Sequence, residues 1–177
     1  MCKNIKIRNI DDYFLVRNIR PDEAAQTAEI EAICFPPEEA LSEKMMSDRI
    51  AKAANHFLVA EDKVTGKIAA FVNGIATDDI SFRDEFFYNA KLHDSSGKDI
   101  VILGVEVLPE YRGRGLASEL MSRYLSRECA RGRKSAILTC EKSKVPMYEK
   151  MGFQERGISD SFWGGKPWYE MQCILNR

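Results

Sequence analysis

One stretch decides the fold, Tyr111-Arg112-Gly113-Arg114-Gly115-Leu116-Ala117. It follows an apolar run at 100–107 that is rich in β-branched residues, which is typical of a buried strand. Beyond it, apolar residues recur at three- and four-residue spacings, as on one face of a helix: Leu116, Leu120, Met121, Tyr124 and Leu125. The sequence therefore predicts a strand, a glycine-bearing turn and an amphipathic helix in succession.

A turn of this kind is suited to a pyrophosphate. The first N–H groups of a helix have no partner within the helix and lie at the positive end of its dipole. Gly113 and Gly115 lack a Cβ atom and let the backbone approach a ligand closely, while Arg112 and Arg114 add positive charge. We therefore expect the N–H groups of 113–118 to bind a phosphorylated cofactor.

Two common phosphate-binding motifs do not fit this loop. A P-loop requires Lys followed by Ser or Thr after its last glycine, and Leu116-Ala117 stands there. The dinucleotide motif requires a third glycine where this chain has Ser118. Taken alone, the loop also fits an ordinary connection between a strand and a helix.

Composition and charge narrow the class of protein. A chain of 177 residues, 45% apolar and 30% charged, is typical of one soluble globular domain. A net charge of −1 argues against nucleic-acid binding. No apolar run approaches the roughly 20 residues of a membrane span, and the first residues lack the apolar core of a signal peptide. We expect a cytoplasmic protein that binds neither nucleic acid nor membrane.

The cysteines and histidines form no metal-binding pattern. Five cysteines are scattered without a C-x-x-C pair, and His56 and His93 are far apart in the sequence. We therefore expect no metal and reduced thiols. Cys140 lies in an apolar run and is expected to be a core residue.

The order of predicted elements is β-α-α-β-β-(α)-β-α-β-α-β-β, a mixed sheet with helices on its faces. Strands are expected at 13–19, 56–61, 67–75, 100–107 and 136–140, with two more in 153–175 joined by a hairpin at Gly164-Gly165. Helices are expected at 21–34, 46–54, 116–131 and 145–151, with a short one in 78–98. Residues 1–12 are interpreted as an N-terminal extension and 13–177 as one domain.

Two motifs resemble the GNAT acetyltransferase superfamily. Arg112-x-x-Gly115-x-Ala117, after a strand that ends in Val-x-Pro, resembles its acetyl-CoA loop, and the segment 145–153 is similar to its P-x-Y-E-x-x-G-F element. The segment 35–40 resembles the arylalkylamine (serotonin) N-acetyltransferase branch and its bacterial relatives. The likeness spans residues 13 to 175. It implies an α/β GNAT-like single domain whose mixed, mostly antiparallel sheet is splayed at the acetyl-CoA site and flanked by helices.

The resemblance also implies roles for particular residues. Backbone groups at Val105 and Val107 would bind the pantetheine and thioester, and the diphosphate would lie on the loop, at Arg112, Gly113, Arg114, Gly115, Leu116, Ala117 and Ser118. Tyr148 would donate a proton to the departing thiolate, since a phenol with a pKa of about 10 is protonated at neutral pH.

The sequence leaves the identity of the general base undecided. Glu106 is the only titratable side chain in 101–107, although strand alternation turns it away from Val105 and Val107 unless a bulge intervenes. Glu38 and Glu39 lie in the segment that resembles the branch's substrate lid, where a carboxylate could attract an ammonium, but they also fit the solvated acidic start of a helix. A water chain to solvent, with no dedicated base, is a further alternative. The branch's histidine pair falls at Val101 and Leu103, so neither its proton path nor its substrate carries over.

The expected activity is direct acetyl transfer, in a ternary complex, to a primary amine of a small molecule, possible acceptors being an arylalkylamine or a polyamine. Aromatic walls for the acceptor are expected at Phe35, Pro36, Pro37, Phe162, Trp163 and Trp168. Acetylation of protein N-termini or lysines and a non-catalytic CoA-binding module are the competing functions. The sequence leaves the acceptor, the acyl-chain length and the choice between monomer and homodimer open.

Overall fold

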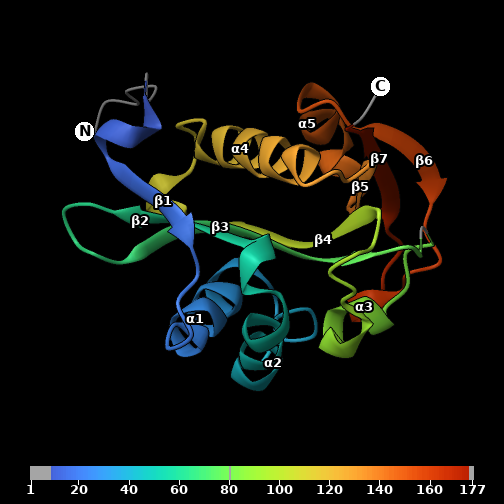
Figure 1. Cartoon of the computed structure of the whole chain (residues 1–177), viewed down its shortest axis with the longest axis horizontal. Coiled ribbons are helices and arrows are strands. Elements are labelled where there is room, and N and C mark those ends of the chain that lie inside the picture. The colour runs from blue at the N-terminus through green and yellow to red at the C-terminus, as the bar shows by residue number, and fades with distance from the viewer. Residues whose placement is uncertain (1–8, 80, 176–177) are drawn as a thin grey trace.

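A mixed sheet runs through the computed structural model, which describes residues 9–79 and 81–175 (Figure 1). Seven strands are hydrogen-bonded in the order β1-β2-β3-β4-β5-β7-β6. Their bounds are β1 Phe14–Asn18, β2 Phe57–Asp62, β3 Ile68–Thr77, β4 Asp99–Val107, β5 Ser135–Cys140, β6 Gln154–Ile158 and β7 Tyr169–Ile174. The helices are α1 Ala24–Cys34, α2 Glu43–Ala53, α3 Glu85–Tyr88, α4 Leu116–Ala130 and α5 Val145–Lys150. The predicted order of elements and the mixed sheet are confirmed.

Short 3₁₀ turns connect several of these elements. They are η1 Ile10–Asp12, η2 Ala54–His56, η3 Ala90–Leu92, η4 Pro109–Tyr111, η5 Lys142–Lys144 and η6 Trp163–Gly165. Among the described helices, none combines the length and the apolar character that a membrane span requires.

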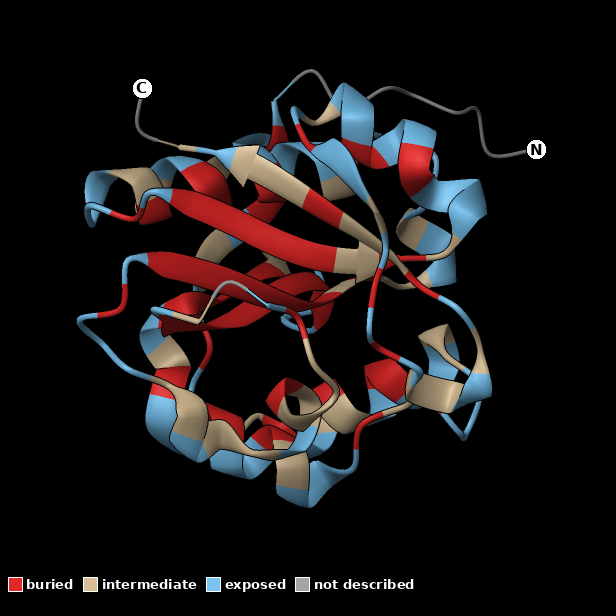
Figure 2. Ribbon diagram, turned by 90° about the vertical axis from the view of Figure 1, so that its right-hand side faces the viewer, coloured by how far each residue is buried: buried red, intermediate tan, exposed pale blue. Residues whose placement is uncertain are grey.

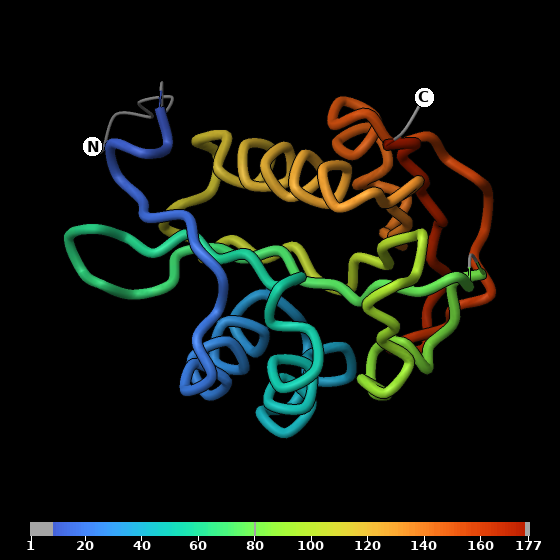
Figure 3. The backbone as a smooth tube through the Cα atoms, in the orientation of Figure 1, coloured from blue at the N-terminus to red at the C-terminus, as the bar shows by residue number. Residues whose placement is uncertain are grey.

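Helices cover both faces of the sheet. Helices α4 and α5 lie on one face, and α1, α2 and α3 lie on the other (Figures 1 and 3). The strands between them are largely buried, and exposed residues lie on the outward sides of the helices (Figure 2). The core is accordingly divided: Leu120 and Met121 of α4 pack on one face, and Met46 and Ile50 of α2 pack on the other.

Strands β4 and β5 form the sheet's one parallel pair among the described strands, and their pairing is short. It joins 99–101 of β4 to 135–137 of β5 and goes no further, although both strands continue. All other neighbouring strands pair antiparallel. The sheet is therefore forked between β4 and β5, at the carboxyl end of β4.

A bulge in β4 decides which side chains face which layer. Asn73 pairs with Gly104, but the next residue of β3 pairs with Ile102, so Leu103 is an extra residue in β4. Before the bulge, Ile102 packs on the α4 face; after it, Val105 and Val107 do. The alternation is therefore shifted by one residue between 102 and 105, and Glu106 faces α1 and α2.

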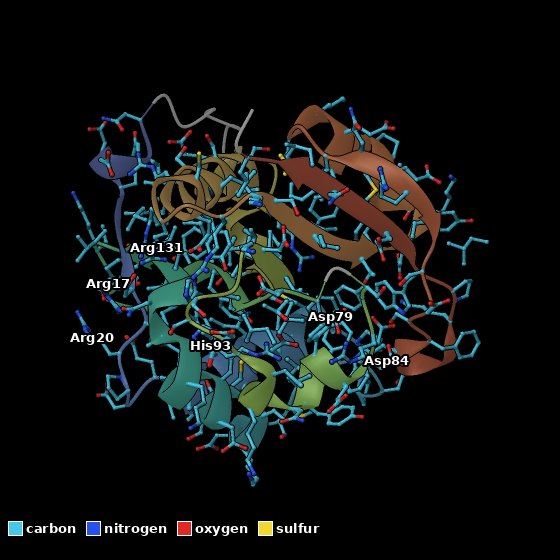
Figure 4. All side chains as sticks on the ribbon, turned by 45° about the vertical axis from the view of Figure 1, so that its right-hand side comes forward. Arg17, Arg20, Asp79, Asp84, His93 and Arg131 are labelled. Atoms are coloured by element: carbon cyan, nitrogen blue, oxygen red, sulfur yellow. The ribbon has the colours of Figure 1, made fainter. Side chains whose placement is uncertain are left out.

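Two predicted features differ in detail. Helix α1 begins at Ala24 rather than at Pro21, because the Glu23 carboxylate is engaged by Arg17 of β1, whose Nη1 donates to it at 2.9 Å. The two last strands are joined not by a tight hairpin but by residues 159–168. This connection is held by Asp84, which accepts hydrogen bonds from Ser161 Oγ and from the Phe162 N–H (Figure 4 labels Asp84).

The predicted boundary between extension and domain, after residue 12, stays a prediction. Of the predicted extension the structure describes residues 9–12. Within them Ile10 is buried in the same core cluster as α4, and the Asp11 carboxylate accepts bonds of 2.7 and 3.0 Å from Arg123 of α4. These residues therefore pack as part of the folded domain.

Candidate active site

The glycine-bearing loop connects β4 to α4 and leaves the start of α4 open to a ligand. Gly115 is the N-cap residue, with φ 87° in the left-handed region, and makes no side-chain cap. Gly113 has φ 74°, and a Cβ at either glycine would meet nothing within 4 Å. The glycines are therefore required for backbone conformation rather than for space. Arg112 fixes the loop to β4, because its Nε donates to the Val107 carbonyl at 2.8 Å.

A groove with a volume of about 460 Å³ runs from this loop along β4. It is lined by all but one of the residues predicted to bind the cofactor: Val105, Val107, Arg112, Gly113, Gly115, Leu116, Ala117 and Ser118. The remaining one, Arg114, lines an adjoining hollow with Asn9 and Ile10. The uncapped helix start, the open glycine loop and the groove beside an unpaired strand edge together fit acetyl-CoA as the resemblance implies.

A second pocket lies inside the fork. Both diverging strands line it, through 102–105 of β4 and 138–140 of β5. Its other walls are Glu31, Phe35, Glu39, Leu41, Phe87, Lys144, Tyr148, Trp163 and Trp168, and its volume is about 70 Å³. The fork pocket and the groove share Phe35, Val105, Lys144 and Tyr148. The two hollows therefore meet at Val105 and Tyr148.

Only some of the residues predicted for the acceptor come together. Phe35, Trp163 and Trp168 line the fork pocket, and Trp163 stacks on Phe87 with ring centroids 4.8 Å apart. Pro36 and Pro37 are exposed in the turn after α1 and are not among the lining residues of either hollow. Phe162 is 62% exposed.

Tyr148 is carried by α5, whose second residue is Pro146. The side chain is buried and packs edge-on against Phe153, with centroids 5.8 Å apart. Burial raises the pKa of the Tyr148 hydroxyl, with the neighbouring Cys140 and Glu106 as further causes. The phenol is therefore protonated at neutral pH, as a proton donor must be.

Glu106 lies on the opposite side of β4 from Val105, in a buried cluster. Its side chain is 1% exposed, next to Glu31 of α1 and Arg49 of α2. Burial raises the pKa of Glu106 well above its usual range, and the charge of Glu31 adds to this effect. Arg49 donates to Asn73 Oδ1 at 2.6 Å, and burial lowers its pKa to about 10.

Sequence reasoning missed Glu31 and Arg49, although each leaves a signal. Arg49 falls on the apolar stripe of Met46, Ile50 and Ala53, and Glu31 lies beside Ile30 on the buried side of α1. A charged residue on a buried helix face requires a partner. That argument indicates a buried pair without naming the partner.

Glu38 and Glu39, which the sequence suggested could attract the ammonium group, lie outside the cluster around Glu106. Glu39 is buried at the wall of the fork pocket, and its carboxylate forms an ion pair of 2.5 Å with Lys166. Glu38 is exposed. The positions of the branch's histidine pair, Val101 and Leu103, are buried in the cluster that contains Phe82.

Cys140 is buried, and burial raises the pKa of its thiol to about 11, so it is an un-ionised core thiol at the fork pocket. Among residues 9–79 and 81–175, no group of three or more His, Cys, Asp or Glu side chains is placed to hold a metal ion.

Comparisons with known proteins agree with this geometry. The model of the acetyltransferase (GNAT) family matches residues 24–153, and the chain therefore belongs to that family, which is one of acyltransferase enzymes. The chain is 32% identical over 114 residues to a serotonin N-acetyltransferase of Mesocricetus auratus, a match that covers 62% of this chain. It spans about half of that relative, 52% of its length.

Solved structures show the same fold. The GphF GNAT-like decarboxylase in complex with isobutyryl-CoA superposes with a TM-score of 0.78 at 18% identity, covering 92% of this chain and 100% of that one. A phosphinothricin acetyltransferase from Sinorhizobium meliloti, in complex with acetyl-CoA, gives a TM-score of 0.67 at 18% identity, covering 93% and 89%. The structural neighbours thus include proteins solved with acetyl-CoA and with another acyl-CoA.

Proposed function

We propose that this protein transfers the acetyl group of acetyl-CoA directly to a primary amine of a small molecule, in a ternary complex. One observation carries the proposal: the groove beside the glycine loop and the aromatic fork pocket meet at Val105 and Tyr148. A thioester delivered along the groove would therefore meet an amine held in the fork pocket without crossing solvent.

The groove supports a defined placement of the cosubstrate. Its diphosphate would bind the N–H groups of 113–118 at the start of α4. Its pantetheine arm would lie along β4, where the strand has no pairing with β5 beyond Val101. Backbone groups at Val105 and Val107 would then bind the arm, and an N–H group at Val105 would polarise the thioester carbonyl.

Glu106, which lines the groove, and Tyr148, which lies at the junction, supply the required proton transfers. An alkyl ammonium with a pKa of about 10.4 must lose a proton before it attacks, and the proposed base is the buried acid site that contains Glu106. The N–C bond then forms and the C–S bond breaks. Tyr148 protonates the thiolate and recovers a proton from the amide nitrogen, while the proton on Glu106 leaves to solvent. The products are the acetamide, CoA-SH and one proton.

The fork pocket supports a small acceptor with an apolar stem. Its walls include Phe35, Trp163 and Trp168, and Glu31 adds an acidic group. The Glu39 carboxylate is paired with Lys166, and Lys144 is a basic residue of the same lining. Aromatic faces and carboxylates attract an ammonium group, and aromatic rings pack on an aryl or alkyl stem. The volume of about 70 Å³ favours a small molecule over a protein chain. Acetylation of protein N-termini or lysines is the second candidate.

Thiol release from acetyl-CoA tests the acceptor class. We expect release with tryptamine, phenethylamine or spermidine, and little with a peptide or with a strongly anionic amine, because the pocket is small and aromatic and is lined by Glu31. Release with the peptide alone would favour the second candidate. If calorimetry shows that the protein binds acetyl-CoA but no amine supports thiol release, the non-catalytic CoA-binding module is the remaining function.

The loop is tested by Gly115→Ala. A Cβ at φ 87° costs about 1–2 kcal/mol, so the loop must shift and misplace its N–H groups. We expect the Kd for acetyl-CoA, measured by calorimetry, to rise about tenfold. Gly132→Ala is the matched control, because Gly132 has φ 85° and equally open surroundings at the far end of α4. It should lower stability but leave the Kd unchanged; equal Kd values for both variants would contradict the assignment.

A further inference from the structure

Two buried carboxyl groups from distant parts of the chain meet beneath the fork. Glu31 comes from α1 and is 2% exposed, and Glu106 comes from β4 and is 1% exposed. The two carboxyls interact, and Glu31 raises the pKa of Glu106. Glu31 lines the fork pocket, whereas Glu106 lines the groove. The pair therefore joins the two hollows.

The surroundings of Glu106 leave its carboxylate without a donor. Among the described residues, neither Oε1 nor Oε2 of Glu106 has a hydrogen-bond partner when both acids are ionised, although both atoms are buried. An unpaired buried carboxylate is strongly disfavoured. A single proton held between Glu31 and Glu106 supplies the missing donor. Glu31 is further fixed because its Oε2 accepts a bond of 3.2 Å from the Leu41 N–H.

The charges around Glu31 and Glu106 favour a state in which one carboxyl is ionised and the other is protonated. The titratable groups that act most strongly on Glu106 include Glu31 and Cys34 of α1, Arg49 of α2 and Tyr148 of α5. Arg112 and Lys144 line the groove with it. Cys34 and Tyr148 are uncharged at neutral pH, because burial raises the pKa of each. The guanidinium of Arg49 therefore balances one ionised carboxyl, and the second carboxyl is neutral when it holds the proton.

The backbone makes room for this arrangement. A Cβ at Gly104 would lie 2.4 Å from Glu106 Oε1 and 2.7 Å from Asn73 Nδ2. The carboxyl of Glu106 thus lies against the strand in the space that a side chain at 104 would take. The bulge at Leu103 places both Gly104 and Glu106 on this side of the sheet.

We propose that Glu31 and Glu106 act as one base with a shared proton, and that Glu31 is the catalytic residue that meets the ammonium group of the acceptor. This inference rests on the proposed function and extends it. The pair begins with one proton and takes a second from the ammonium through Glu31, which frees the amine lone pair. The added proton leaves from Glu106 through the groove after the N–C bond has formed and the C–S bond has broken.

The pair is tested in the free protein by NMR of glutamate labelled at the carboxyl carbon. In the wild type we expect one protonated carboxyl at neutral pH, shared by the two residues. In Glu31→Gln the titration midpoint of Glu106 should fall by at least about 1 pH unit, because a neighbouring like charge is lost. Glu29→Gln, an exposed position on the same helix, should leave the midpoint unchanged.

Glu106→Gln tests the pair from the other side, should Glu31→Gln fail to fold. The midpoint of Glu31 should then rise, because the carboxyl of Glu106 lowers the pKa of Glu31 and an amide is the weaker hydrogen-bond donor. Ordinary, independent titration of both residues in the wild type overturns the proposal. So does a Glu106 midpoint that Glu31→Gln does not move, or a Glu31 midpoint that Glu106→Gln does not move.

The catalytic role of Glu31 is tested separately, with an amine that supports thiol release. Glu31→Gln should lower kcat by at least about 10²-fold and move the acidic limb of kcat/KM to lower pH, with the KM for acetyl-CoA unchanged. If Glu31→Gln leaves the acidic limb of the kcat/KM profile unchanged, Glu31 does not have this catalytic role. Absence of release with every amine would refute the proposed function, and the catalytic role with it, whereas the NMR titration would still decide whether the proton is shared.

Discussion

Replacing Tyr148 by phenylalanine is expected to lower kcat by about 10²- to 10⁴-fold, the usual contribution of a positioned proton donor. The hydroxyl lies where the groove and the fork pocket meet, and burial keeps it protonated. Its ring packs against Phe153, and phenylalanine preserves that contact. The Kd for acetyl-CoA should therefore change little, so the loss should appear in single-turnover rates.

Tyr169→Phe is the matched control for this prediction. Tyr169 is a half-buried tyrosine of β7 whose ring contacts Lys142 rather than the fork pocket. Its loss of a hydroxyl should leave kcat unchanged. If Tyr148→Phe retains the wild-type kcat, Tyr148 is a core residue and the thiolate obtains its proton from solvent.

Replacing Glu128 by glutamine is expected to lower the free energy of unfolding by about 3–5 kcal/mol, because it removes the anion from a buried ionic cluster. Glu128 of α4 is 0% exposed. Its carboxylate accepts bonds from His56 Nδ1 at 2.9 Å and Arg131 Nη1 at 2.6 Å, and it pairs with Arg133 at 3.5 Å. Figure 4 labels Arg131 in this region.

Urea unfolding as a function of pH checks the cause. Burial opposes the ionised form of Glu128, but His56 and Arg131 outweigh it and lower its pKa below the usual 4.5. A carboxyl whose pKa is lower in the folded state than in the unfolded state stabilises the protein at pH values above its unfolded-state pKa. This stabilisation is lost as the pH falls through the folded-state pKa. The wild type and Glu128→Gln should therefore differ most at neutral pH and converge in acid.

Glu119→Gln on the same helix is the control for the buried cluster. Glu119 is an exposed residue that pairs with Arg123, and exposed pairs contribute about 0–1 kcal/mol. A loss at Glu128 no larger than the loss at Glu119 would contradict the expected role of the cluster.

Local patterns predicted the elements well, because strands and helices leave their own periodicity in the sequence. The run 100–107, the glycine loop and the stripe from Leu116 to Leu125 lie where β4, its following loop and α4 are found. The residues of the predicted cofactor loop lie together for the same reason: they are consecutive, so local structure alone brings them together.

The acceptor side could not be predicted in this way, because long-range contacts assemble it. Glu31 meets Glu106 across 75 positions of sequence. The bulge at Leu103 depends on how β3 pairs with β4. Residues 159–168 form a long connection because Asp84 anchors it and because Trp163 Nε1 donates to the Glu39 carbonyl at 2.9 Å. A sequence shows the glycines of that segment but not these partners.

The fork between β4 and β5 leaves two strand edges without a partner strand beyond their short pairing. Unpaired strand edges on the outside of a protein recruit other chains and promote aggregation. Here the two free edges face each other in the interior, with helices above and below (Figure 1). Pantetheine is a thin chain that carries its own amides, and these could pair with such an edge. In the proposed complex the pantetheine arm lies along β4 where a neighbouring strand is missing. Binding of the cosubstrate would therefore complete the hydrogen bonding of the sheet at this edge.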